Sequence, residues 1–224
     1  MRSRSGIEGV DVAAATFVVG TDLIECDFLT LEDAMANLPQ SRGKIFILGG
    51  TFSLLTKQSL PNGPIRFEGS GEDSTIIDAS GADFTIFESA FNIQYEFTDM
   101  TVLGSGHVGS LFFAAKAGSG ATPGFIGERL TVTGVEKCLY APTGCAVFAT
   151  IEHCVWKVAD LASSFHGDTV DPATGTIDAS DSVLTSVGGG TRGGFRGSWG
   201  GFIHDDCVVN LLNGGEFGFF VAFG

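Results

Sequence analysis

The chain has 224 residues, of which 44% are hydrophobic and 33 are glycine, and its 26 acidic residues against 12 lysines and arginines give a formal net charge of −14. This length suits one domain with a sizeable core, and the apolar share is too high for a disordered chain. The acidic balance argues against nucleic acid and anionic membranes as partners, because both are bound through basic surfaces. The apolar runs are far shorter than the ~20 residues that cross a bilayer, so no membrane span is expected.

The first predicted elements are an arm, a short strand and one helix. Residues 1–16 are expected to form a loose arm that attaches the protein to a partner, and residues 17–224 to form the folded domain. No apolar stretch follows the basic start Met1–Arg4, so no secretion signal is expected. Thr30 can cap a helix over about 30–38, whose apolar face combines Leu31, Ala34, Met35 and Leu38. Such a helix would cover the exposed core at the first turn of a repeating fold.

The next stretch resembles a known family. It reads KIFILGGTFSLL at residues 44–55 and IRFEGSGEDSTIIDASG at residues 65–81. These segments, after an acidic-hydrophobic entry and a short helix, resemble the opening of pectate-lyase-like right-handed parallel β-helix proteins. That superfamily includes pectate lyases, polygalacturonases and the tailspikes and fibres of bacteriophages. The resemblance is close over about residues 20–80 and implies the fold rather than an activity, since the family hosts lyases, hydrolases and non-catalytic shafts.

One eight-residue pattern then occurs five times between residues 95 and 209. Its copies are Tyr95–Val102, Phe125–Val132, Ala149–Trp156, Ile177–Leu184 and Phe202–Val209. Apolar residues two apart on both sides of two polar residues predict a strand, a corner and a second strand, followed by a variable returning loop. One such turn cannot bury its inward side chains alone, so successive turns must stack about 4.8 Å apart with parallel strands. With the resemblance, this predicts an all-β, right-handed, single-stranded parallel β-helix of roughly seven turns.

The aligned copies predict which side chains face the core. The third position holds Phe97, Gly127, Ile151, Ala179 and His204, and the sixth holds Met100, Leu130, Cys154, Ser182 and Cys207. The seventh position should face outward and holds Thr101, Thr131, Val155, Val183 and Val208. The three outward valines either reflect the ordinary preference of strands for β-branched residues or form an apolar stripe that a partner covers.

Cysteine and histidine give no sign of a metal site along the sequence. The five cysteines, Cys26, Cys138, Cys145, Cys154 and Cys207, contain no C-x-x-C pair, and we interpret Cys154 and Cys207 as small core residues. Cys138 and Cys145 lie in one predicted loop and could pair, although nothing requires it. The four histidines lack metal-ligand spacing, so neither a metal nor another cofactor is expected.

Two segments near the end suggest contacts with other molecules. The glycine-rich residues 188–201 superficially resemble an RGG box, but two arginines in an acidic chain favour a flexible loop between turns. The alternative is that its side chains grip a sugar or a neighbouring subunit through stacking and guanidinium hydrogen bonds, with Arg192, Phe195, Arg196 and Trp199 as the binding residues. The apolar segment Phe217–Gly224 has no amphipathic helix after it, which predicts that another chain covers it.

Catalytic residues are only partly represented. Polygalacturonase-like sites, by resemblance, combine an Asp pair, a third Asp, a His-Gly and a late Arg-x-Lys. Here Asp205–Asp206 and His166–Asp168 supply similar parts in the wrong order, and the Arg-x-Lys at 42–44 precedes both. We interpret Asp205 and Asp206 as solvated corner residues, with acid/base work as the alternative. Pectate-lyase-like Ca²⁺ chemistry needs an acid cluster beside a base, and no repeat position offers that combination.

These observations favour a non-catalytic structural component of a bacteriophage particle: a spike, fibre or capsid-decoration protein located in the virion. Its expected partners are further copies of itself, as a trimer by analogy with phage spikes, other virion proteins, and a host-surface polysaccharide as a further candidate. The alternative is a secreted or cell-surface polysaccharide lyase or glycoside hydrolase acting on an acidic or bacterial surface glycan, with His166, Asp168, Asp205 and Asp206 as catalytic residues. A bacterial surface adhesin is disfavoured because no export signal is expected.

Overall fold

A computed structural model describes most of the chain: residues 16–38, 42–81, 83–106, 110–164, 175–187, 194–196, 199–204 and 206–212. Nearly all of the predicted arm and the whole apolar tail lie outside these residues. So do four of the predicted site residues, His166, Asp168, Arg192 and Asp205. In the described part of the chain, no helix has the length and apolar character needed to cross a bilayer.

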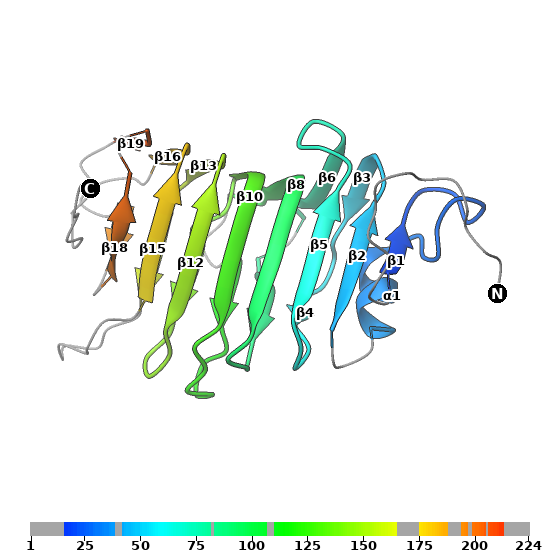
Figure 1. Ribbon diagram of the computed structural model, residues 1–224, viewed down its shortest axis with the longest axis horizontal. Coiled ribbons are helices and arrows are strands. Elements are labelled where there is room, and N and C mark those ends of the chain that lie inside the picture. The colour runs from blue at the N-terminus through cyan, green and yellow to red at the C-terminus, as the bar shows by residue number, and fades with distance from the viewer. Residues whose placement is uncertain are drawn as a thin grey trace.

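The described residues form a right-handed parallel β-helix, in which each turn adds a strand parallel to the one before (Figure 1). The predicted fold is therefore confirmed. The first row of strands appears as the series of slanted arrows along the long axis in Figure 1. It consists of β1 (Thr16–Val19), β2 (Gly43–Ile47), β5 (Ile65–Gly69), β8 (Gln94–Gly104), β10 (Gly124–Thr133), β12 (Val147–Glu152), β15 (Gly175–Ser180) and β18 (Trp199–Ile203).

A second row follows the first across a corner. It contains β3 (Gly50–Ser53), β6 (Thr75–Ala79), the C-terminal halves of β8 and β10, β13 (Val155–Val158), β16 (Val183–Ser186) and β19 (Val208–Leu211). The first two rows correspond to the strand–corner–strand pattern of the repeats. One rung, meaning one full turn of the helix, therefore contains the pattern once.

A third row occupies the segment where the sequence predicted only a variable loop. Its strands are β4 (Gln58–Ser59), β7 (Thr85–Ser89), β9 (Leu111–Ala115), β11 (Lys137–Ala141), β14 (Asp160–Ser164) and β17 (Gly194–Arg196). These strands escaped prediction because they are short and lack clean alternation, as in β9, where Phe112 and Phe113 are both fully buried. β17 and the first three residues of β18 fall within the flexible loop expected at 188–201, and the other residues of that segment lie outside the described residues. Six rungs carry all three rows, and β18 and β19 begin a seventh.

The inward file predicted for the sixth repeat position is confirmed. Met100, Leu130, Cys154 and Ser182 are each no more than 1% exposed, and Cys207 is partly buried. Beside them, the rings of Phe67, Phe97 and Phe125 stack on successive rungs, with centroids 4.8 and 5.5 Å apart. Phe67 and Phe97 pair in register, so their rings stack directly as expected for parallel strands. Phe125 instead pairs with Tyr95, and its ring reaches Phe97 because Gly127, the register partner of Phe97, has no side chain.

The predicted alignment is wrong at the last repeat. β18 pairs with β15 so that Ile203 lies opposite Ala179, and Ile203 is 5% exposed, whereas His204 follows the strand and is exposed. Three steps separate Ala179 from Ser182, but four separate Ile203 from Cys207, so the last corner contains one extra residue. A shift of one residue moves every side chain of a strand to the opposite face.

The predicted capping helix is present as α1 (Leu31–Ala36), beside β1 at the N-terminal end (Figure 1). The Thr30 hydroxyl oxygen accepts a hydrogen bond of 3.1 Å from the Asp33 amide, as an N-cap should. Leu31 and Ala34 are buried in the same core as the strands. The helix therefore extends the core beyond the first rung.

All five cysteines are free, so Cys138 and Cys145 do not pair. Cys154 is fully buried, which supports its interpretation as a core residue, and burial raises the pKa of its thiol to about 12.

Candidate functional site

The corner between the first and second rows carries a column of charged side chains. Asp99, Arg129, His153 and Asp181 occupy equivalent positions on four successive rungs, and their φ angles are 58°, 46°, 53° and 46°. This left-handed conformation is uncommon outside glycine, although Asp and His tolerate it better than most residues. Each rung bends at this one residue, so the four side chains line one edge of the molecule.

The first two residues of this column, Asp99 and Arg129, form an ion pair. Arg129 Nε and Nη2 lie 2.5 and 3.0 Å from the two carboxylate oxygens of Asp99, a bidentate contact between neighbouring rungs. The guanidinium hydrogen bonds lower the pKa of Asp99 below its ordinary value, and the carboxylate raises the pKa of Arg129. Arg129 Nη1 also contacts Glu128 of its own corner.

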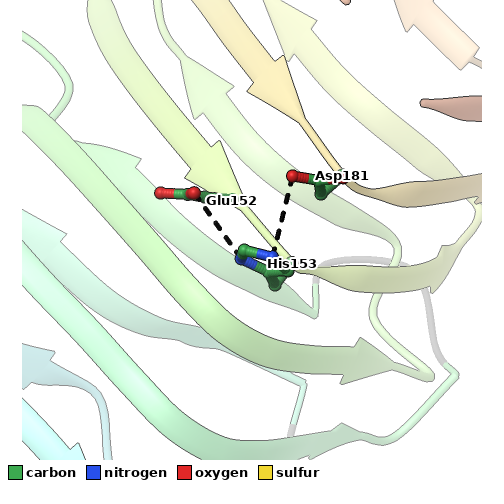
Figure 2. A group of neighbouring side chains, drawn as sticks. All are labelled: Glu152, His153 and Asp181. Carbon is green, nitrogen blue, oxygen red and sulfur yellow. Dashed lines mark ion pairs between the residues drawn. The ribbon is translucent and has the colours of Figure 1, made fainter. Parts of the chain in front are cut away.

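The next two rungs bring together Glu152, His153 and Asp181, as Figure 2 shows. His153 Nδ1 lies 3.7 Å from a Glu152 carboxylate oxygen, and His153 Nε2 lies 3.6 Å from an Asp181 carboxylate oxygen. One ligand atom from each residue can be chosen so that all three lie within 4.8 Å of one another. An imidazole nitrogen with carboxylate oxygens is a donor set that suits Zn²⁺ and similar ions.

Sequence reasoning missed this group because it searched for histidine spacing along the chain. His153 and Asp181 are 28 residues apart, as their numbers show, and become neighbours only because that interval equals one rung. The signal that indicates the group is the fifth position of the eight-residue pattern, which His153 and Asp181 share.

A second histidine–carboxylate pair lies one rung further along. His204 Nε2 is 3.0 Å from an Asp178 carboxylate oxygen, and both side chains are about half exposed. Asp206, the one described member of the predicted catalytic set, is exposed at the same last corner. The other three members lie outside the described residues, so the predicted constellation stays a prediction.

The predicted binding residues are distributed over two rows. Phe195 and Arg196 belong to β17 in the third row, and Trp199 begins β18 in the first row, while Arg192 lies outside the described residues. Phe195 and Arg196 therefore do not share a strand with Trp199.

The valine stripe, defined as Val155, Val183 and Val208, faces outward on the second row, as predicted. The three residues pair in register across β13, β16 and β19 and are 44%, 39% and 50% exposed. Two more exposed apolar residues, Val187 and Leu212, follow β16 and β19 on the same two rungs.

A shallow depression lies at the other end of the first row. It has a volume of about 250 Å³ between β2, β5 and β8, and its polar lining includes Arg42, Lys44 and Arg66. Glu68 lies 2.8 Å from both Lys44 Nζ and Arg66 Nε, although the Arg66 contact is too poorly angled for a hydrogen bond. Glu96 also lines the depression, 3.5 Å from Arg66 Nη1, so three cations meet two carboxylates here and leave a local charge of +1 in a chain that carries a net charge of −14.

Comparison with known proteins yields only structural neighbours. No protein-family model matches the sequence, and no curated protein matches it. Among solved structures, a pectin methylesterase in complex with a hexasaccharide and the pectin methylesterase PemA from Erwinia chrysanthemi each align over 87% of this chain and 80% of their own, with 10% identity and a TM-score of 0.46. The ORF18 protein of Geobacillus virus E2 aligns over 92% of this chain and 62% of its own, with 13% identity and a TM-score of 0.44.

The parallel β-helix itself is established by the strand pairing of this chain. At these identities and TM-scores the likeness assigns neither a family nor an activity to this chain.

Proposed function

We propose that this protein is a non-catalytic structural component of a bacteriophage particle, a spike, fibre or decoration protein, and that its copies associate through the valine stripe. The observation that carries the proposal is the outward exposure of Val155, Val183 and Val208 on three consecutive rungs. Contiguous exposed apolar surface on a folded protein commonly marks a contact with another protein.

The direction of the stripe supports lateral association. Its residues pair across neighbouring strands, so the stripe runs along the axis of the β-helix with a step of about 4.8 Å. A second β-helix lying parallel to the first could therefore cover the stripe along its whole length. In this arrangement the first row of strands would take no part in the interface.

Each residue of the valine stripe contributes only a modest part of the free energy of association. Burying the remaining exposed half of one valine contributes on the order of 1 kcal/mol, so the stripe with Val187 and Leu212 supplies roughly 5 kcal/mol per interface. A dissociation constant of 1 μM requires about 8 kcal/mol, so further contacts must take part. In a closed ring such as a trimer each interface contains one stripe against another face of the next chain, and each chain takes part in two interfaces, so ring closure supplies further contacts.

The oligomeric state tests this proposal. We expect size-exclusion chromatography with light scattering to give a multiple of the 23.3 kDa chain mass for the natural protein. Val183→Lys should give the single-chain mass, because a charge in the stripe cannot be buried without a partner. Thr150→Lys, the same new side chain on the exposed face of β12, is the matched control and should leave the oligomer intact. A natural protein that stays monomeric at all concentrations would overturn the proposal.

The location in the virion requires a separate measurement. Mass spectrometry of purified particles from a phage that encodes this chain should detect it in a fixed ratio to the capsid protein. Its absence from such particles would refute the virion assignment and leave the oligomer proposal standing.

A second candidate function is action on an acidic polysaccharide, and the depression lined by Arg42, Lys44 and Arg66 is the observation that favours it. Cations grouped on an otherwise acidic molecule attract carboxylate-bearing chains. Incubation with a broad panel of anionic polysaccharides should then release new reducing ends or unsaturated, ultraviolet-absorbing products. The absence of such products from every polysaccharide of the panel would count against this function.

A further inference from the structure

The corner cluster places one imidazole between two carboxylates from neighbouring rungs. Glu152 ends the first-row strand of the fifth rung, His153 follows it at the corner, and Asp181 occupies the same corner of the sixth rung (Figure 2). All three side chains are about half exposed, at 54%, 51% and 50%. Solvent and ions can therefore reach them.

The distances in this cluster are too long for ordinary hydrogen bonds. A charged nitrogen and a carboxylate oxygen that bond directly lie about 2.7–2.9 Å apart, but the two contacts of His153 measure 3.7 and 3.6 Å. Two ligand atoms that each lie about 2.1 Å from a tetrahedral Zn²⁺ are roughly 3.4 Å apart. One ion binds a single imidazole nitrogen, so only one of the two contacts can become a ligand pair, and the 3.6 Å between His153 Nε2 and Asp181 is closer to this second spacing.

The neighbouring histidine provides an internal comparison. His204 is about equally exposed and also faces a carboxylate of the adjacent rung, but its Nε2 lies only 3.0 Å from an Asp178 carboxylate oxygen. The wider spacing around His153 is therefore not a general property of exposed histidine pairs in this protein.

We propose that Glu152, His153 and Asp181 bind a divalent transition-metal ion, with Zn²⁺ as the best match, and that the ion links the fifth rung to the sixth. Nitrogen together with carboxylate oxygen suits Zn²⁺, Ni²⁺ or Cu²⁺ better than Ca²⁺ or Mg²⁺, which prefer oxygen alone. Water completes the coordination, as it does in zinc sites with three protein ligands.

A small rearrangement closes the site. An ion binds one imidazole nitrogen, and the two carboxylates face opposite nitrogens, so one carboxylate must turn toward the other side of the ring. No pair of the chosen ligand atoms is more than 4.8 Å apart, so closure to about 3.4 Å needs a shift of at most about 1.4 Å. Glu152 is the natural residue to move, because its side chain is the longest and the most exposed of the three.

The backbone holds the other two ligands in place. Paired strands on both sides of the corner, β12 with β15 and β13 with β16, fix the rungs that carry His153 and Asp181. The ion would bridge two corners separated by 28 residues of chain, as their numbers show, and would hold together rungs that are otherwise joined by strand pairing. Binding to the folded state alone would also raise the thermal stability of the protein.

The test uses the full chain after treatment with a chelator. Isothermal titration with zinc chloride should show one saturable site per chain, and zinc should raise the unfolding temperature. His153→Asn should lower the affinity at least tenfold, because asparagine tolerates the left-handed backbone but replaces the imidazole ligand. Asp181→Asn removes one charged ligand with the same backbone tolerance and should also lower the affinity at least tenfold.

His204→Asn is the matched control, since it removes the other paired histidine of the same region. This variant should bind zinc as the natural protein does. Circular dichroism shows whether each variant is folded. If His153→Asn does not fold, Asp181→Asn decides whether the cluster binds zinc. The absence of a saturable site, or a site that survives in both folded variants of the cluster, would overturn the proposal.

Discussion

The aromatic file through the core makes a direct prediction about Phe97. Its ring stacks on Phe67 at 4.8 Å and on Phe125 at 5.5 Å, and it also contacts Phe87 and Phe112 at 4.8 and 5.5 Å. It is fully buried on β8, a middle strand of the first row. Phe97→Ala therefore removes a ring with aromatic neighbours on the rungs before and after it.

The expected loss follows from the packing. Replacing a buried Phe by Ala costs about 3–5 kcal/mol, and each aromatic contact adds about 0.5–1.5 kcal/mol beyond buried area. The strands on both sides hydrogen-bond to β8, so they cannot close in to fill the space. We therefore expect Phe97→Ala to lower the free energy of unfolding by about 5 kcal/mol.

Urea unfolding followed by circular dichroism measures this loss. Phe148→Ala is the matched control, because Phe148 is 48% exposed on the outward face of β12 and should cost less than about 1 kcal/mol. Equal losses in the two variants would show that Phe97 does not lie in an inner file, and the assigned register of the first row would then be wrong.

Three further predictions concern the corner and a core thiol. Gly69→Ala should lower the free energy of unfolding, measured with urea, by about 2 kcal/mol or more, because its new Cβ would lie 2.1 Å from the Asp99 carbonyl oxygen. Gly81→Ala is the control: a Cβ there meets open space, and the free energy of unfolding should change by less than about 0.5 kcal/mol. The hydrogen bonds from Arg129 lower the pKa of Asp99 in the folded protein below its ordinary value of 3.8. They therefore stabilise the fold fully above pH 3.8, and this stabilisation is lost as the pH falls through the pKa of Asp99 in the folded protein. Asp99→Asn should thus cost under about 1 kcal/mol at neutral pH, because the pair is partly exposed, and the cost should shrink in acid; a cost independent of pH would contradict this origin. The pKa of Cys154, about 12, and its burial predict that iodoacetamide, followed by mass spectrometry, labels it in the unfolded protein but not in the folded protein at mildly alkaline pH.

The sequence by itself determined the repeating core. Apolar residues two apart on both sides of two polar residues leave a strand–corner–strand turn as the consistent interpretation, and the burial of Met100, Leu130 and Cys154 in one file confirms it. Thr30 and its apolar helix face were also sufficient to place α1. These features could be predicted because period-two alternation and helix capping are local properties of the chain.

The third row of strands was decided by the tertiary structure. β9 and β11 carry consecutive buried residues, a pattern that local alternation cannot distinguish from a loop, and they become strands only because neighbouring rungs offer partners. The register of β18 was decided in the same way, since one extra corner residue moves Ile203 inward and His204 outward.

The candidate site also depended on tertiary structure. The sequence marks His153 and Asp181 as equivalent positions of two repeats, but it specifies neither the left-handed bend that points them along one edge nor the distance between them. Contacts between rungs join residues more than twenty positions apart, and their geometry follows from strand pairing across the whole turn. The repeat therefore determined which residues stack, and the tertiary structure decided which of them meet outside the core.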